Sequence, residues 1–318
     1  MAIRIARIEQ DGQPLWAVES ADGLRALSKN YPTTQAFFEQ GGVDDAKSAQ
    51  STGTVISSDV RFLSPVTRDA RFVCQATNYA DHVRETGGNP AHVANNILFT
   101  KASSCIVAAD SDIICPSHVR LLDYEIELGL VLKRGFAEPH DVQAGDIRDW
   151  IGGLVIVNDI TARDVQISHM QFHKSKSYRT FGPVGPWLVI PQGDEWSRLF
   201  DLELTLSVDG QMRQKALADE MIFKPHQTLS ELTRIMDLNA GDLIATGTPA
   251  GVALRPPPAF VQAIGGFLNP AARFKAFLKG QLKRDQYLKP GQVISSSIAT
   301  HDGAIDLGHQ RNCIVITH

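Results

Sequence analysis

The sequence contains few cysteines and gives them no regular spacing. Only four of the 318 residues are cysteine, and no two of them form a CxxC pair: Cys74, Cys105, Cys115 and Cys313. A disulfide scaffold or a cysteine-ligated zinc site would need closer, paired spacing. These cysteines are scattered among Val, Ile and Phe, so we expect buried free thiols of a reducing compartment. A catalytic cysteine is the weaker alternative.

Long apolar runs and an excess of positive charge are also missing. No stretch of about 18 apolar residues predicts a membrane-spanning helix. The start, MAIRIARIEQDG, lacks the apolar core of a secretory signal. The formal net charge is −4, which argues against a nucleic-acid-binding surface. The most basic cluster, residues 274–284, is typical of the solvated face of an amphipathic helix. We therefore expect a cytoplasmic protein that binds neither membranes nor nucleic acids.

What remains is an ordinary globular composition, with 43% hydrophobic and 21% charged residues. Residues 1–67 predict a small N-terminal α/β unit, and Pro65 within a polar cluster marks its boundary. Residues 68–318 predict the larger domain. Within it, residues 253–286 are first rich in proline and then helical, so we interpret them as an insertion between two strands.

Short strands outnumber helices from Phe72 onward. One helix is predicted near Thr161 and another from Thr228, where Thr228 and Glu231 would form a capping box. The Asp-Gly pair at residues 209–210 predicts a hairpin. Strands that do not alternate regularly with helices argue against a doubly wound parallel sheet. The predicted fold class is therefore α+β and predominantly β.

Two glutamates, Glu125 and Glu127, stand two residues apart in LDYEIELGLVL, residues 122–132, which predicts one strand. Side chains at i and i+2 of a strand share a face, so both carboxylates would lie roughly 6–7 Å apart along the backbone. Burying both is unfavourable unless a cation compensates them. A divalent cation and a solvent-facing strand are both open explanations. By strict alternation Asp123 shares this face, unless the strand bends or starts there.

A third oxygen ligand is offered by Asp159. It follows the apolar strand of GGLVIVNDITARD, directly before the predicted helix. A carboxylate at that strand end, opposite the Glu-x-Glu strand, would complete a three-carboxylate site. All-oxygen ligands suit Mg²⁺, Mn²⁺ or Ca²⁺ rather than zinc. Such a site leaves positions for water and substrate.

A histidine and a glutamate, His82 and Glu85, are three residues apart near a helix start and would share one face. A carboxylate beside an imidazole raises its basicity and fixes its tautomer, which suits a general base acting on water. A surface ion pair is the simpler alternative. Another pair, His169 and His173, lacks an HExxH motif, and we expect it on a helix surface.

Glycine-rich segments surround two further polar residues. Lys176 is predicted on a loop ahead of the Gly-Pro residues 182–186, and Gly247 and Thr248 lie where a strand ends in ATGTPAG. Glycines there let backbone N–H groups approach a ligand closely. Taken singly, a solvated lysine and ordinary turns explain the same residues.

In their order along the chain, these stretches resemble the fumarylacetoacetate hydrolase family. The matching motifs are NYADHVRETG, LDYEIELGLVL, GGLVIVNDITARDVQ, KSYRTFGPVGPWLV, LSVDGQMRQ, LSELTRIMDLNAGDLIATGTPAGV and LGHQRNCIV, over about residues 72–318. The resemblance implies a mixed β-roll or sandwich catalytic domain and a homodimer. It also implies a bound Mg²⁺ or Mn²⁺, with Ca²⁺ as a further choice.

Motif matching assigns the residue roles that the resemblance implies. The metal ligands are Glu125, Glu127 and Asp159. The catalytic residues are His82, Glu85 and Lys176, and the substrate-binding residues are Tyr79, Lys101, Arg179, Gly247 and Thr248. This chain departs from the family at Thr77, where acylpyruvase-like members have an arginine that helps to hold the substrate carboxylate. It also has Arg179 where many members have aspartate. Arg179 would either supply a replacement cation for an anionic substrate or form an ion pair on the surface.

Together these roles imply a hydrolase that cleaves a C–C bond in a 1,3-dicarbonyl or acylpyruvate-type substrate. The cation stabilises the developing enolate, and His82, oriented by Glu85, activates water. Lys176 and Thr248 stabilise the oxyanion. The same site would serve a 2-keto acid decarboxylase or isomerase of the oxaloacetate or hydroxymuconate type, without attack by water. A non-catalytic binding or regulatory protein is a third reading, although every metal and dyad position is chemically competent.

Overall fold

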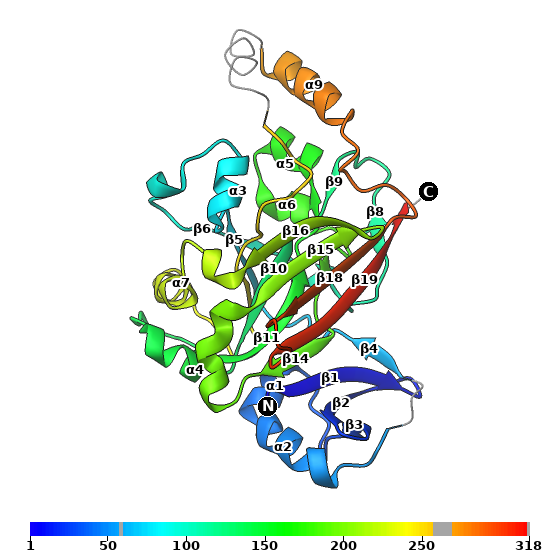
Figure 1. The fold of residues 1–318 in the computed structure, drawn as a ribbon, viewed down its shortest axis with the longest axis vertical. Coiled ribbons are helices and arrows are strands. Elements are labelled where there is room, and N and C mark those ends of the chain that lie inside the picture. The colour runs from blue at the N-terminus through cyan, green and yellow to red at the C-terminus, as the bar shows by residue number, and fades with distance from the viewer. Residues whose placement is uncertain (57–59, 257–268, 317–318) are drawn as a thin grey trace.

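Strands dominate the architecture of the protein. The computed structural model describes residues 1–56, 60–256 and 269–316 (Figure 1). Strand accounts for 34% of residues and helix for 26%, which confirms the predicted α+β, predominantly β fold. No helix in the described ranges combines the length and the apolar character needed to cross a bilayer.

The larger sheet has the strand order β3-β2-β1-β14-β11-β10-β17-β5-β6, with β4 paired to β1. Every residue of its central strands β10 and β11 is buried. A strand covered on both faces reads as an unbroken apolar run, which explains why a charged residue stands out in it. The strands are β1 (Ile3–Gln10), β2 (Gln13–Ser20), β3 (Gly23–Ala26), β4 (Arg61–Leu63), β5 (Phe72–Ala76), β6 (Ile97–Lys101), β10 (Ile126–Leu132), β11 (Ile151–Asn158), β14 (Trp187–Ile190) and β17 (Leu243–Ala245).

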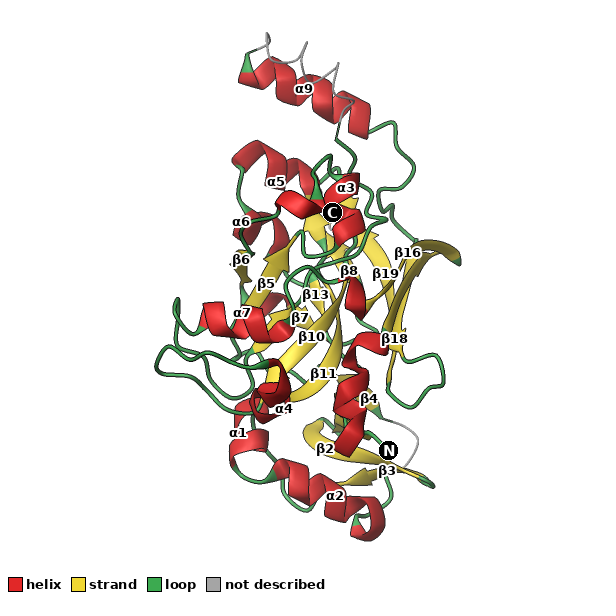
Figure 2. Ribbon diagram, turned by 60° about the vertical axis from the view of Figure 1, so that its left-hand side comes forward, coloured by secondary structure: helices red, strands yellow, loops and turns green. Residues whose placement is uncertain are grey.

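A five-stranded sheet, ordered β16-β15-β18-β19-β8, packs against the larger one through contacts of β10 with β15 and of β11 with β19 (Figure 2). Its hairpin turns at Asp209 and Gly210, both with positive φ, as the Asp-Gly pair predicted. Its strands are β8 (Ile113–Cys115), β15 (Glu203–Val208), β16 (Gln211–Leu217), β18 (Val293–Ala299) and β19 (Asp306–Ile316). Two short ladders complete the β-structure, β9 (Leu122–Asp123) with β12 (Thr161–Ala162) and β7 (Ile106–Val107) with β13 (Gly182–Pro183).

The helices lie around the sheets and at both ends of the molecule (Figures 1 and 2). They are α1 (Thr34–Glu39), α2 (Gly42–Thr52), α3 (Ala80–Glu85), α4 (Ile147–Trp150), α5 (Arg163–His169), α6 (Phe172–Lys176), α7 (Pro225–Leu232) and α9 (Pro270–Gln281). The predicted capping box at Thr228 is wrong, because α7 begins at Pro225 and Thr228 lies inside it. The Thr228 hydroxyl instead accepts a hydrogen bond from the Gln75 amide at 2.9 Å.

The first 67 residues form β1 to β4 with α1 and α2, and they are not separated from the larger sheet. Strand β1 pairs antiparallel with β14, with Ile5 opposite Leu188. The Thr34 side chain also hydrogen-bonds the backbone N–H of Thr67, at 2.9 Å. The division into an N-terminal unit and a catalytic domain at residue 67 therefore stays a prediction about organisation.

Part of the predicted insertion, residues 257–268, lies outside the described residues. The described part contains α9, which projects from the top of the molecule in Figure 1. Lys275, Lys279 and Lys283 are exposed, whereas Phe277 and Leu278 are partly buried against the core. Lys275 and Lys279 of the basic cluster thus lie on the solvated face of α9, as its composition predicted, whereas Lys283 and Arg284 follow the helix.

Candidate functional site

The register of β10 and β11 brings three carboxylates to one face. Ile126 pairs with Asn158, so Glu125 and Asp159 are opposite each other just beyond the two strands. The backbone N–H of Asp159 donates to the Glu125 carbonyl at 2.8 Å. Glu127 lies two residues further along β10 and points to the same face. Carboxylates that are 34 residues apart in the chain are neighbours because the ladder is antiparallel.

The strand carrying the glutamates is interrupted, which corrects the prediction of one strand over residues 122–132. β9 ends at Asp123 and β10 begins at Ile126. Asp123 pairs with Thr161 in the separate β9–β12 ladder. The break interrupts the alternation between Asp123 and the two glutamates, and Asp123 is not one of the three residues whose ligand oxygens lie together.

The three carboxylates can hold a metal ion. Ligand oxygens of Glu125, Glu127 and Asp159 all lie within 4.8 Å of one another, and all three residues are buried. Burial, with Asp159 and Glu125 beside it, raises the pKa of Glu127 well above its usual value. Burial alone would also raise the pKa of Glu125, but Arg163 and Lys176 outweigh it and lower that pKa. A hard divalent cation would relieve the repulsion that Glu127 experiences, so this donor set fits one.

Two buried lysines contact the same carboxylates. The Lys176 ammonium donates to Glu125 Oε2 at 2.7 Å, to Asp159 Oδ2 at 2.5 Å and to Thr161 Oγ1 at 2.7 Å. The Lys101 ammonium donates to Asp159 Oδ1 at 2.5 Å. Burial opposes their charge, but the carboxylates prevail and raise the pKa of both lysines. Lys176 is the last residue of α6 rather than part of a loop, which corrects its predicted setting.

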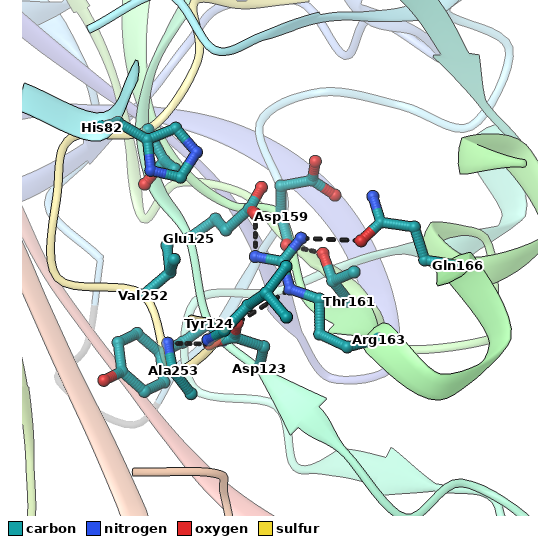
Figure 3. Close-up of polar contacts among 12 residues, drawn as sticks. His82, Asp123, Tyr124, Glu125, Asp159, Thr161, Arg163, Gln166, Val252 and Ala253 are labelled. Atoms are coloured by element: carbon teal, nitrogen blue, oxygen red, sulfur yellow. Dashed lines mark hydrogen bonds and ion pairs between the residues drawn. The ribbon is translucent and has the colours of Figure 1, made fainter. Parts of the chain in front are cut away.

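A buried arginine, Arg163, completes the cluster, and the sequence analysis did not identify it. Its Nε donates to Asp123 Oδ2 at 2.8 Å, and a terminal nitrogen donates to Glu125 Oε1 (Figure 3). Its other terminal nitrogen donates to Gln166 Oε1 at 2.9 Å. Strand alternation could not have revealed it, because Arg163 is the first residue of α5 and its partners Asp123 and Glu125 lie about 40 residues earlier in the chain.

The predicted His–Glu pair lies beside the carboxylates. His82 and Glu85 are on α3, His82 buried and Glu85 partly buried, with His82 Nδ1 3.2 Å from Glu85 Oε2. His82 stands on the Glu125 side of the cluster in Figure 3. Because Nδ1 faces Glu85, Nε2 is the ring nitrogen left for chemistry. The alternative of an exposed surface pair does not hold, since both side chains are 9% exposed.

Tyr79 was predicted to bind substrate. Tyr79 is fully buried, and among the described residues its hydroxyl has no hydrogen-bond partner of good geometry. Burial and the nearby Glu127 raise its pKa well above the usual value, so it stays a neutral donor. A buried, unpartnered hydroxyl beside this cluster is a place where a ligand atom can bind.

Gly247 and Thr248 support the cluster through other contacts. The Gly247 N–H donates to Glu127 Oε2 at 2.9 Å, and the Thr248 hydroxyl donates to the Ile126 carbonyl at 2.9 Å. Arg179 is exposed, and no hydrogen bond or ion pair joins it to another described residue. No described partner makes it a surface ion pair, and its role as a replacement cation for an anionic substrate stays a prediction. Thr77 adopts a left-handed conformation with φ of 54°, which is unusual for a β-branched residue.

The family model that describes the fumarylacetoacetate (FAA) hydrolase C-terminal domain matches residues 71–315. The chain belongs to the fumarylacetoacetate hydrolase family. This confirms the resemblance drawn from the motifs. Enzymes of the family generally depend on a divalent metal, and the buried carboxylate cluster of this member is a possible place for it.

Curated relatives and solved structures agree with this membership. The mitochondrial oxaloacetate tautomerase FAHD2B of Bos taurus is 33% identical over 263 residues, covering 78% of this chain and 81% of the relative. The fumarylacetoacetate hydrolase of Exiguobacterium antarcticum is 28% identical with a TM-score of 0.72, over 99% of this chain and 100% of that one. The 2-hydroxyhepta-2,4-diene-1,7-dioate isomerase of Mycobacterium marinum is 25% identical with a TM-score of 0.68, over 99% of each chain.

Proposed function

We propose that this protein is a divalent-metal-dependent enzyme that interconverts the keto and enol forms of a small anionic 2-keto acid. The observation that carries the proposal is the buried cluster of Glu125, Glu127 and Asp159, with ligand oxygens within 4.8 Å of one another. An enolate is the species common to every reaction this site was predicted to support. Tautomerisation needs only that species and two proton transfers.

The charge balance of the site favours an anionic substrate. Four buried carboxylates, those of Asp123, Glu125, Glu127 and Asp159, face three buried cations, those of Lys101, Arg163 and Lys176. With all of them ionised the cluster carries one negative charge, and a divalent cation changes this to one positive charge. Uncompensated charge is unfavourable in a buried site, so a carboxylate-bearing substrate completes the balance.

When bound, Mg²⁺ or Mn²⁺ supplies electrostatic stabilisation of the enolate charge. The side chains of this chain carry the protons. His82 Nε2 accepts the proton from the carbon next to the keto group, and Glu85 holds the ring through Nδ1. Lys176 or the Tyr79 hydroxyl donates a proton to the enolate oxygen. The donor then recovers a proton from the His82 imidazolium through solvent. One C–H bond breaks, one O–H bond forms and both side chains return to their starting protonation states, so no co-reactant is consumed.

Two of the relatives support this choice, whereas the fumarylacetoacetate hydrolase of Exiguobacterium antarcticum supports the hydrolytic reaction. One relative that covers most of the chain is named an oxaloacetate tautomerase, and a structural neighbour is named a dioate isomerase. Both names describe movement of a proton in a keto or enol acid without addition of water. They favour the isomerase alternative of the sequence analysis over its hydrolase reading.

The test follows the loss of enol-oxaloacetate by its ultraviolet absorbance at fixed Mg²⁺ or Mn²⁺. The wild type should accelerate the decay and should lose this effect in EDTA. The rate with Glu127→Gln at the same metal concentration measures the reaction that the free cation catalyses, and this rate is subtracted from that of the wild type. A wild-type rate equal to that of Glu127→Gln would overturn the proposal.

Hydrolytic cleavage of a C–C bond in an acylpyruvate or 1,3-dicarbonyl is the second candidate. The largely buried His82–Glu85 pair favours it, because an imidazole oriented by a carboxylate suits activation of water. Incubation with an acylpyruvate in ¹⁸O-water separates the two reactions. Hydrolysis places ¹⁸O in a new carboxylate product, whereas tautomerisation in D₂O places deuterium on the carbon next to the keto group and leaves the skeleton intact.

Metal identity, assembly and location complete the proposal. Oxygen-only ligands support Mg²⁺ or Mn²⁺, with Ca²⁺ as a weaker candidate. The homodimer rests on the family resemblance, and light scattering in solution tests it.

The cytoplasmic location rests on the free thiols. Because one relative is named as mitochondrial, imaging of the tagged protein is the appropriate test.

A further inference from the structure

One short segment, residues 251–255, contacts both halves of the site. On one side it holds Glu85, the partner of His82. The Gly251 N–H donates to Glu85 Oε1 at 2.9 Å and to Oε2 at 3.1 Å, and the Arg255 guanidinium forms an ion pair with the same carboxylate. Glu85 therefore takes its position from this segment as well as from its own helix, α3.

On its other side the segment holds Asp123. The N–H groups of Ala253 and Leu254 donate to the Asp123 carboxylate at 2.8 and 3.1 Å. Asp123 is fully buried and also accepts from Arg163, whose guanidinium contacts the metal-ligand candidate Glu125 (Figure 3). A continuous set of polar contacts thus runs from Glu85 through the segment to Glu125.

The far end of the insertion fixes the same segment. The Gln281 side-chain amide donates to the Arg255 carbonyl at 2.8 Å, and Arg284 Nε donates to the Ala253 carbonyl at 3.1 Å. The Tyr287 hydroxyl donates to Gln281 Oε1 at 2.8 Å, which orients that amide. The end of the insertion, from the last residue of α9 onward, is therefore joined to the segment rather than to the carboxylates themselves.

We infer that Asp123 and Arg255 are positioning residues that couple metal binding at Glu125 to the placement of α3, and so of His82. A cation at the carboxylates fixes the orientation of Glu125, which favours the observed contacts of Arg163 and Asp123. Those contacts fix the backbone of residues 253 and 254 and hence the groups that hold Glu85. By thermodynamic linkage, breaking the Arg255–Glu85 contact must then weaken metal binding, although Arg255 touches no ligand.

The coupling rests on the proposed metal site, and calorimetry with Mn²⁺ tests it in the full-length protein. Arg255→Gln should weaken Mn²⁺ affinity by about 5- to 10-fold, at the lower end of typical coupling between sites. Arg255→Lys keeps the charge and should recover part of the affinity. Arg234→Gln is the matched control, because Arg234 pairs with exposed Asp141 at the surface and should leave affinity unchanged.

Hydrogen exchange gives a second readout. Saturating Mg²⁺ should slow amide exchange in α3 of the wild type, and this protection should be smaller in Arg255→Gln and in Asp123→Asn. If Asp123→Asn does not fold, the Arg255 variants still decide the question. Mn²⁺ affinity of Arg255→Gln within twofold of wild type, with equal protection of α3, would overturn the coupling. If the wild type binds no divalent cation, it is the proposed function that fails.

Discussion

Asp159 lies directly opposite Glu125 across the end of the β10–β11 ladder, and its backbone N–H donates to the Glu125 carbonyl at 2.8 Å. This backbone contact sets the spacing of two carboxylates before any ion binds. Lys176 bridges the same pair through its ammonium group. The site is therefore preorganised by the sheet and neutralised in part by side chains, which leads to three predictions.

Replacing a metal ligand should abolish metal-dependent turnover. Groups that only orient a ligand are typically worth 10- to 100-fold in metal affinity, so Glu127→Gln or Asp159→Ala should cost more than roughly 100-fold. Calorimetry with Mn²⁺ and turnover in the same buffer measure both effects. Glu203→Gln, at a half-exposed pair with Lys215, is the control. Full activity of Glu125→Ala, or of wild type in excess chelator, would refute the metal assignment.

Removing the Lys176 charge should destabilise the metal-free protein more than the Mg²⁺-bound protein. Lys176→Met leaves Glu125 and Asp159 buried without their shared cation, a change that typically costs about 3–5 kcal/mol. Saturating Mg²⁺ should restore part of this free energy of unfolding. Urea unfolding with and without Mg²⁺ measures it, with the exposed neighbour in Lys174→Met as control. An equal loss in both conditions would mean that Lys176 contributes packing rather than charge.

The role of His82 separates the possible reactions. His82→Ala should slow both tautomerisation and hydrolysis by roughly 10²–10⁴-fold, because each needs a proton accepted at the ring. Decarboxylation breaks a C–C bond without that proton transfer and should persist. Product analysis by mass spectrometry distinguishes these results, and His169→Ala, at an exposed histidine of α5, is the control. Unchanged tautomerisation in His82→Ala would assign the base to another residue.

The cysteines should differ in reactivity. Burial raises the pKa of Cys74 and Cys105, and it raises that of Cys115 from its ordinary value near 9 to about 11. A thiol reagent at pH 8 should therefore label Cys313, which is only partly buried, and all four cysteines after unfolding. Since the unfolded chain ionises Cys115 first, the free energy of unfolding should fall as the pH rises from 9 to 11. Rapid labelling of several native thiols would contradict this assignment.

The sequence identified most of the site because strand periodicity is local. The alternation of Glu125 and Glu127 placed two carboxylates on one face, and the i, i+3 spacing paired His82 with Glu85. These rules depend only on neighbouring backbone geometry. They failed at Thr228, where a proline at residue 225 starts the helix earlier, and at Lys176, which ends a short helix that sequence periodicity did not reveal.

Contacts between distant segments were beyond such rules. Arg163 is buried because Asp123 and Glu125 accept its hydrogen bonds, and no composition or periodicity encodes a partner about 40 residues away. The same holds for residues 251–255, whose N–H groups meet Glu85 and Asp123 across separations of more than 120 residues.

By itself the sequence determined the family, the predominantly β architecture and the three carboxylates of a possible metal site, because motifs and local periodicity can be recognised without a fold. Only the tertiary structure decided how the buried charges are arranged. The break after Asp123 separates it from the glutamates, and Arg163 joins it back to Glu125. Burial makes each unpaired charge unfavourable, so pairing across the fold, which no local pattern contains, fixes the geometry of the site.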